Sequence, residues 1–163
     1  MKSLLLTIFC FSVFALSAQE ADTKSFAKQY AKKDGFTVVT ISKAAMKLMT
    51  LFSKSDNDDM LSKIDRVQII SAEPRGQGNA NSFTNEVLEF CKANLFEEIM
   101  EVEDAKEQVK IFCRSDEGKI TDFIIWNYSQ SDASTNLVCV NGKFTPENVS
   151  TMVNTRGKGI VGL

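Results

Sequence analysis

Histidine is absent from this chain of 163 residues. Imidazole is the only side chain whose unperturbed pKa lies near neutral pH, so Ser-His-Asp triads, Cys-His pairs and His-ligated zinc are all excluded. Any catalysis would therefore depend on carboxylates, a perturbed lysine, a metal held by oxygen ligands, or a cofactor. No catalytic or metal-binding motif stands out and no cofactor is indicated, which favours a non-enzymatic protein.

A strong excess of charge of either sign is also missing. Nineteen basic residues face 21 acidic residues, which gives a formal net charge of −2. Such a balance provides no long-range attraction toward nucleic acid or anionic lipid, so nucleic acid is not expected as a partner. Internal repeats and low-complexity segments are absent too, and a composition of 44% hydrophobic and 25% charged residues is typical of a globular domain.

The N-terminus carries the clearest targeting signal. Lys2 supplies a positive charge, Leu4 to Leu16 forms an almost unbroken apolar run, and small residues lead up to Ala18. This layout is typical of a secretory signal peptide, and the run is too short to span a membrane comfortably. We therefore expect residues 1–18 to be removed and the mature chain, without a transmembrane segment, to be periplasmic or secreted.

The remainder is expected to form one α+β domain over residues 19–154, followed by a flexible, glycine-bearing tail over residues 155–163. Its segments predict a mostly antiparallel, two-layer sheet of about 5–6 strands with 3–4 helices on one face, because helices dominate the first half and successive strands the second. The predicted helices are 22–33, 42–52, 60–64, 82–95 and a last one from 145. The predicted strands are 36–41, 66–71, 98–103, 108–114, 119–128 and 135–140, with a turn at Asn141-Gly142.

One polar loop is a candidate ligand site. Arg75, Gly76, Gly78 and Asn79 precede the predicted helix that begins at Ser82. Backbone N–H groups at such a junction bind small anions when the loop wraps around them. A surface loop without a ligand is the alternative interpretation.

A sheet face is a candidate partner surface. If residues 116–118 form a three-residue turn, Lys110, Phe112 and Arg114 share one side of the sheet with Trp126 and Tyr128. An exposed aromatic patch with basic neighbours would bind a protein partner. The alternative is that a second layer covers this face and buries the aromatic side chains.

Three cysteines remain once Cys10 leaves with the leader. Cys91 has helical spacing with apolar neighbours, whereas Cys113 and Cys139 lie in strand-like runs. The three are interpreted as small buried hydrophobic residues, with a Cys113–Cys139 disulfide plus one free thiol as the alternative.

The segments FAKQYAKKDGFTVVTISKAAMKLM and IDRVQIIS, after an Ala-Gln junction, make the chain similar to a known family. It resembles small exported Bacteroidetes proteins grouped as domain of unknown function 4252. The resemblance implies an exported Gram-negative α+β domain and assigns no functional residue. Many members look like lipoproteins, but this chain has no cysteine at the predicted cleavage point.

Together these features lead to a hypothesis of a non-enzymatic exported domain that binds a protein, with an envelope protein as the expected partner. The alternative is a carrier of a small or anionic ligand, or a weak hydrolase that uses carboxylates. That alternative predicts an enclosed pocket with converging charged groups.

Overall fold

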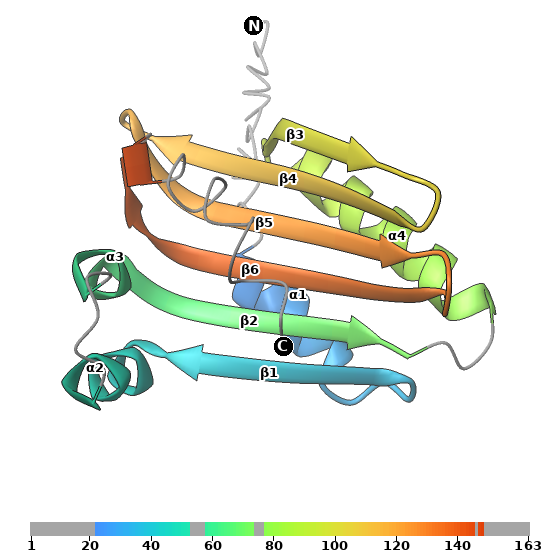
Figure 1. Cartoon of the computed structure of the whole chain (residues 1–163), viewed down its shortest axis with the longest axis horizontal. Coiled ribbons are helices and arrows are strands. Elements are labelled where there is room, and N and C mark those ends of the chain that lie inside the picture. The colour runs from blue at the N-terminus through green and yellow to red at the C-terminus, as the bar shows by residue number, and fades with distance from the viewer. Residues whose placement is uncertain (1–21, 53–57, 74–76, 146, 149–163) are drawn as a thin grey trace, which may run out of the picture.

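The computed structural model describes residues 22–52, 58–73, 77–145 and 147–148 (Figure 1). In these ranges it holds a six-stranded antiparallel sheet and four helices, which confirms the predicted α+β class. The predicted leader and tail lie outside the described residues. In chain order the elements are α1 (Thr23–Tyr30), β1 (Phe36–Ser42), α2 (Lys43–Phe52), α3 (Asp58–Lys63), β2 (Ile64–Ala72), α4 (Gln77–Ala93), β3 (Glu97–Glu103), β4 (Glu107–Asp116), β5 (Lys119–Ser129) and β6 (Ser134–Phe144).

The strand order across the sheet is β1-β2-β6-β5-β4-β3. Strands β3 to β6 follow one another as antiparallel neighbours, so each of them pairs with the strand next to it in sequence. Strand β2 breaks this pattern, because it pairs with β1 on one side and with the distant β6 on the other. The two edges of the sheet are therefore β1 and β3, visible at opposite sides of Figure 1.

Helices α1 and α4 lie behind the sheet in Figure 1 and cover one of its faces. Asp22 starts α1 by accepting a hydrogen bond from the Lys24 N–H at 3.1 Å, which satisfies a donor at the helix terminus. Phe26, Ala27 and Tyr30 then bury one side of the helix. The Tyr30 ring meets that of Phe83 from α4 edge to face, with centroids 4.9 Å apart. The layer between helices and sheet is thus largely aromatic.

The other two helices, α2 and α3, lie together at one end of the sheet (Figure 1). Met46 of α2 and Leu61 of α3 join a second apolar cluster, which includes Ile111 and Phe123 from the centre of the sheet. Because neighbouring residues of a strand point to opposite faces, Phe123 belongs to this second cluster while Ile124 belongs to the first. Both faces of the central strands therefore carry apolar side chains. Within the described ranges, no helix is long and apolar enough to cross a membrane.

The turn between β4 and β5 is one residue shorter than the predicted turn. Glu117 and Gly118 have φ angles of 47° and 76°, and such a pair of positive values is typical of a two-residue type I′ turn. A register shift follows, so that Asp116 pairs with Lys119 but Arg114 pairs with Asp122. The shorter turn alone would have moved Lys110 to the other face of the sheet relative to Trp126. The extra residue in β5 cancels this change, so Lys110 lies opposite Trp126 on the same face, as the sequence predicts.

The predicted turn at Asn141-Gly142 is wrong, because both residues lie inside β6. Glycine is required there by close packing rather than by a turn. A Cβ atom on Gly142 would lie 2.3 Å from the carbonyl oxygen of Lys63 and 2.5 Å from the Phe144 ring. The predicted last helix falls mostly outside the described residues, although Thr145 accepts from and donates to Asn148 as an N-cap residue would.

Candidate functional site

The predicted anion loop is shorter than expected, since α4 begins at Gln77 rather than Ser82. Arg75 and Gly76 lie outside the described residues, and Gly78 and Asn79 fall in the first turn of α4. Glycine and asparagine are poor helix formers, so their sequence favours a loop. The buried Ala80 and Phe83 explain why the helix nevertheless extends to this end.

Ser82 is exposed within α4 and donates a hydrogen bond to Glu86 at 3.1 Å, so the predicted helix start at Ser82 is wrong. A shallow hollow of about 320 Å³ beside it is lined by Lys33, Asp34, Phe36, Ser82 and Glu86. Glu86 also accepts from the Tyr30 hydroxyl and lies 3.7 Å from the Lys33 ammonium. With two carboxylates and one ammonium, this hollow is unfavourable for an anion.

The Tyr30–Glu86 contact shifts the pKa values of both groups. Burial, with the Glu86 carboxylate as a smaller cause, raises the pKa of Tyr30. The hydrogen bond from Tyr30 lowers the pKa of Glu86 below its ordinary value of 4.5. Glu86 therefore stays ionised and Tyr30 stays protonated at neutral pH, which suits a structural contact between α1 and α4 rather than proton transfer.

The predicted partner surface is wrong at its aromatic centre. Phe112 and Trp126 are only 5% and 2% exposed, because α1 and α4 cover this face of the sheet. Tyr128 is half-buried and stacks on Trp126 with nearly parallel rings, 6.3 Å apart. The prediction that Lys110 and Arg114 share this side of the sheet with Trp126 is correct. The alternative interpretation, in which a second layer buries the aromatic side chains, therefore explains the sequence pattern. The sequence shows which residues share a side but not which side a helix covers.

The proposed Cys113–Cys139 disulfide is also wrong. Cys113 pairs with Phe123 and Cys139 with Ile124, so the two sulfurs point to opposite faces with β5 between them. Strands two positions apart are separated by roughly 9–10 Å, which exceeds the Cα separation that a disulfide allows. Cys91, Cys113 and Cys139 are free thiols. Burial raises the pKa of Cys91 to about 12 and also raises that of Cys139, so neither is poised as a nucleophile.

A buried polar network missed by the sequence analysis lies at the end of the sheet where β4 turns into β5. Asp122, only 5% exposed, accepts hydrogen bonds from the Arg114 Nε and Nη2 atoms at 3.1 and 2.9 Å. It also accepts from the Thr121 hydroxyl at 2.9 Å and from the Asn141 amide. Asn141 in turn exchanges hydrogen bonds with the Thr23 hydroxyl of α1. The network thus links β4, β5 and β6 to the start of α1.

Register irregularities coincide with this network. The shifts fall between Arg114 and Ser115, between Ile120 and Asp122, and, in β2, between Ile64 and Arg66. Bulges of this kind redirect side chains and are frequent beside functional sites. Here they bring Arg114 and Asp122 opposite each other, and Arg66 reaches Asp22 at 3.8 Å.

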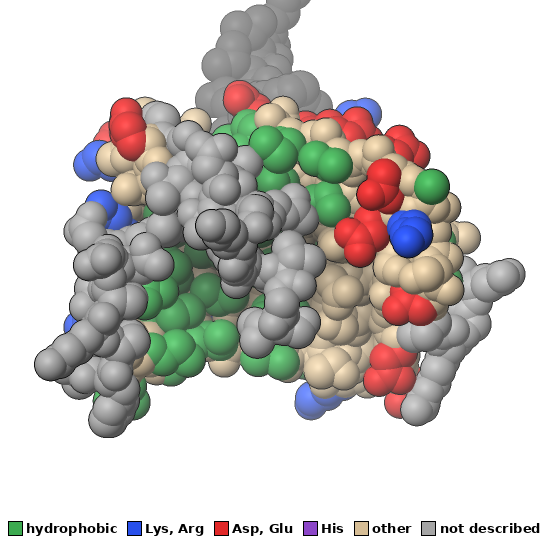
Figure 2. Space-filling view, viewed as in Figure 1, with side chains coloured by type: hydrophobic (Ala, Val, Ile, Leu, Met, Phe, Trp, Pro, Cys, Tyr) green, Lys and Arg blue, Asp and Glu red, His purple; other side chains and the backbone are tan. Residues whose placement is uncertain are grey.

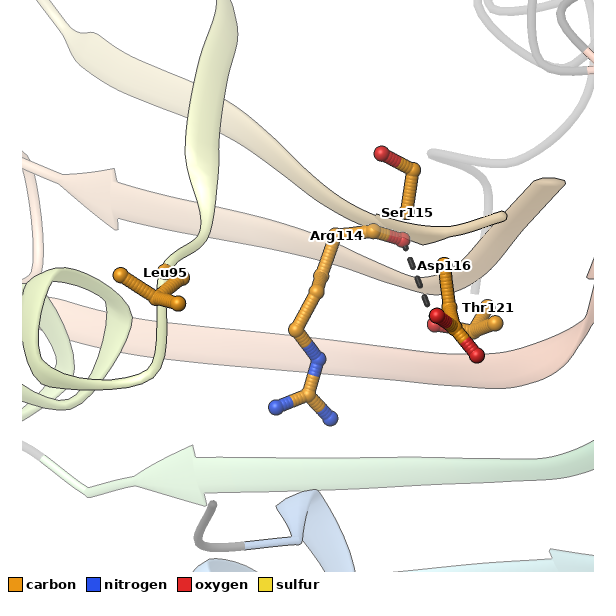
Figure 3. A pocket seen from close by; sticks show the side chains of 5 residues that line it. All are labelled: Leu95, Arg114, Ser115, Asp116 and Thr121. Carbon is orange, nitrogen blue, oxygen red and sulfur yellow. Dashed lines mark hydrogen bonds between the residues drawn. The ribbon is translucent and has the colours of Figure 1, made fainter. Parts of the chain in front are cut away.

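A hollow of about 230 Å³ adjoins the network and is lined by Leu95, Arg114, Ser115, Asp116 and Thr121. Figure 3 shows the Arg114 side chain extending between Leu95 and Thr121, and the Thr121 hydroxyl, which shares its one proton with Asp122, lies 3.3 Å from the Arg114 carbonyl oxygen. The Arg114 guanidinium lies over the Phe96 ring, 4.9 Å from its centroid, as well as against Asp122. Both charges of the pair are already engaged, so the arrangement is built to hold the sheet together rather than to transfer protons.

The edge strand β1 carries the most distinctive exposed surface. Its seven residues, FTVVTIS, include no charge, and Val39 is 45% exposed. On α2, which follows directly, Leu48 and Met49 are 56% and 49% exposed. The sequence identifies FTVVTI as a strand, but an edge position depends on which strands pair and is invisible in a single segment. We refer to Val39, Leu48 and Met49 with strand β1 as the β1 surface.

Among the described residues, no group of three or more Cys, Asp or Glu side chains is placed to hold a metal ion. Comparison with curated proteins gave no match, and comparison with solved structures gave none either. A family model matches residues 30–152, which covers most of the chain and all six strands. The chain therefore belongs to the family described as Domain of unknown function (DUF4252).

Proposed function

We propose that this chain is an exported, non-enzymatic domain that binds a protein partner through the β1 surface. The observation that carries the proposal is the exposed, uncharged edge strand with three large apolar side chains beside or within it. An open strand edge presents unpaired backbone N–H and C=O groups, and an extended segment of another protein satisfies them by adding a strand. Exposed apolar side chains then add contact area and specificity.

The export half of the proposal is supported by the sequence of residues 1–18, which has the layout of a secretory signal peptide. A Gram-negative envelope, as in Bacteroidetes, is the proposed setting, and an envelope protein is the proposed partner. Fractionation of cells that express the natural chain, with mass spectrometry of its N-terminus, tests this half. A chain that retains Met1 in the cytosolic fraction would contradict it.

The binding half is tested by capture of partners from envelope extract with the wild-type chain and two matched variants. Val39→Lys adds a charge to β1, and Val102→Lys adds the same charge to β3, where Val102 is 50% exposed. We expect a partner to be retained by the wild type and by Val102→Lys but lost by Val39→Lys, because a charged edge resists strand addition. Equal capture by all three proteins would contradict binding at β1.

The alternative of a small-ligand carrier or carboxylate hydrolase would use the hollow beside Arg114. Its charged lining consists of Arg114, which is paired with Asp122, and the exposed Asp116. This lining offers a ligand little unbalanced charge, so the β1 surface supports the protein-binding function better.

A further inference from the structure

The β1 surface has a feature that goes beyond a general capacity to bind protein: its strand is complementary to itself. An antiparallel copy placed against the outer side of β1 with a two-fold axis at Val39 sets Val39 opposite Val39. The same register sets Thr37 opposite Ile41 and Val38 opposite Thr40. No position of the seven-residue strand brings two like charges together, because β1 has none. Cross-strand pairs of β-branched residues such as these stabilise antiparallel sheets.

The faces of the strand agree with this pairing. Ile41 packs into the cluster on the sheet face that also contains Val67 and Val138, whereas Phe36 and Val38 pack into the cluster beneath α1 and α4. Val39 pairs with Ile69 and so lies on the same face as Ile41. In the two-fold arrangement, the side chains that point to one face in the first copy meet side chains that point to the same face in the second copy. The alternation of side chains between the two faces is therefore kept across the contact.

Charge complementarity appears at the two ends of the strand. In the same register, Phe36 of one copy is opposite Ser42 of the other, so the turn that holds Asp34 lies at the same end of the pair as the start of α2, where Lys43 lies. Asp34 is exposed and has no ion-pair partner among the described residues, while Lys43 is 53% exposed and contacts Asp65 in its own chain. The two-fold axis brings these opposite charges to each end of the β1–β1 pair, which favours the antiparallel arrangement.

The opposite edge does not offer an equivalent match. Strand β3 has the sequence EEIMEVE, so pairing it with a second copy of itself would bring carboxylates together. Figure 2 shows hydrophobic side chains exposed over the part of this view where β1 and β2 run, whereas acidic side chains gather toward the end where β3 turns into β4. A closed two-fold contact uses only β1 and leaves β3 outside, which is the commonest form of homo-oligomer.

We infer that the partner bound at β1 is a second copy of this chain, joined through an antiparallel β1–β1 pair about Val39 that doubles the six-stranded sheet. This inference rests on the proposed function, since both use the same surface, and it specifies the partner.

Analytical ultracentrifugation of the purified chain, with its N-terminus established by mass spectrometry, tests the inference over about 1 to 500 µM protein, the range in which weak dimers form. We expect a monomer–dimer equilibrium for the wild type, at least a tenfold increase in dissociation constant for Val39→Lys, and little change for Val102→Lys. Far-ultraviolet circular dichroism and the emission of the buried Trp126 confirm that each variant is folded.

Cross-linking provides a second readout that does not depend on affinity. Directly opposed residues of antiparallel strands have Cα atoms about 4.5–5.5 Å apart, within the range that a disulfide spans. Under mild oxidation Val39→Cys should therefore give a covalent dimer on a non-reducing gel, whereas Val102→Cys should not. The wild type controls for the native thiols, of which Cys91 and Cys139 are buried.

A wild-type chain that stays monomeric at every protein concentration tested overturns the inference. Val39→Lys and Val102→Lys variants whose dimer dissociation constants rise equally also overturn it. Growth into longer oligomers that Val102→Lys also abolishes would indicate β1–β3 pairing and overturn it as well. The proposed function fails separately. If the chain is monomeric but captures an envelope protein that Val39→Lys does not, the partner is a different protein and the β1 surface still binds it.

Discussion

Apolar side chains on the two edges of the sheet are exposed to similar fractions, but the two edges differ in charge. Val39 on β1 is 45% exposed, and Ile99 and Val102 on β3 are 43% and 50% exposed. Strand β3 interleaves these residues with four glutamates, two of which contact Lys110. Strand β1 has no charge at all. Charged edge strands resist pairing with another strand. The comparison therefore teaches that the exposure of apolar side chains does not by itself distinguish an edge that can pair. The presence or absence of charged residues between those side chains makes the difference.

The largest effect is expected from breaking the polar network that links β4, β5 and β6 to the start of α1. Asp122→Asn removes the charge that balances Arg114, and both side chains are mostly buried, with 7% and 14% exposed. An uncompensated buried charge costs about 3–5 kcal/mol of unfolding free energy. Urea denaturation would measure this loss. Hydrogen exchange should show that protection falls at both β1 and β3, since both edges depend on the central strands.

Asp116→Asn is the matched control, because Asp116 lies at the end of β4 and is exposed. It should change stability by no more than about 0.5 kcal/mol. An Asp122→Asn variant that is as stable as this control would show that the network contributes little to holding the edges together.

A second effect is expected from giving β3 the character of β1. Glu97→Thr with Glu103→Thr removes two charges from the edge and leaves the contacts of Lys110 with Glu98 and Glu101 in place. We expect new self-association through β3, with apparent affinity raised at least tenfold, or about 1.4 kcal/mol. Sedimentation velocity would detect it as species larger than those of the wild type. Unchanged sedimentation would mean that charge is not what distinguishes the edges.

A smaller effect is expected from Lys110→Met on the β3 side. The Lys110 ammonium lies 3.2 Å from Glu98 and 2.8 Å from Glu101, and its side chain is 19% exposed. Removing it should cost about 0.2–1 kcal/mol, and less at high salt, as for other pairs near the surface. Lys43→Met is the matched change beside β1, where Lys43 contacts a single carboxylate. If urea denaturation shows that Lys110→Met and Lys43→Met lower the free energy of unfolding equally, the ion pairs beside β3 contribute no more than the single pair beside β1.

The smallest effect concerns pH. The hydrogen bond from Tyr30 lowers the pKa of Glu86, and that from Lys110 lowers the pKa of Glu101, both from 4.5. A carboxyl whose folded pKa is depressed contributes stability that is present above its unfolded pKa and is lost as pH falls through the folded value. Glu86→Gln should therefore flatten the acid side of the stability curve below about pH 4.5.

Glu101→Gln should flatten that curve less than Glu86→Gln, because Glu101 lies on the exposed edge strand β3 whereas Glu86 accepts a hydrogen bond from the buried Tyr30 hydroxyl. Denaturant midpoints measured from pH 3 to pH 7 (roughly the span over which carboxyls titrate) would compare the two variants. A steeper change for Glu101→Gln would show that the exposed β3 charges matter more than the α1–α4 contact.

The positions of the strands along the chain could be predicted from the sequence because their signal is local, whereas their order in the sheet could not. Runs such as FTVVTI and KITDFIIWNY are rich in β-branched and aromatic residues and are bounded by Gly or Asp, so their strands are correct within a few residues. Helix α1 follows from its apolar spacing in the same way. The start of α4 was missed, because Gly78 and Asn79 favour a loop locally and only the buried Phe83 side of the helix outweighs them.

The candidate sites were harder to predict, because they depend on pairing between distant segments. The periodicity places Lys110, Phe112 and Trp126 on one side, but only the packing of α4 shows that this side is covered. The Arg114–Asp122 pair depends on a bulge that no local signal marks. Likewise, Gly142 resembles a turn residue in the sequence, yet it is selected by contact with Lys63 from a segment nearly 80 residues away.

The strand order has a consequence for how the chain reaches its native state. Strands β3 to β6 close three successive hairpins, whose loop-closure entropy is small, so this meander is able to form early. Pairing of β2 with β6 must wait until more than 60 intervening residues are ordered, as the Ile70–Leu137 pair illustrates. We therefore expect the β2–β6 seam to be the late step of folding, and pulse-labelling hydrogen exchange would show β5 amides protected before those of β2. In a cell, the β1–β2 pair would be the last part to join, and the side of β2 that faces β6 would stay open to neighbouring chains until that seam closes.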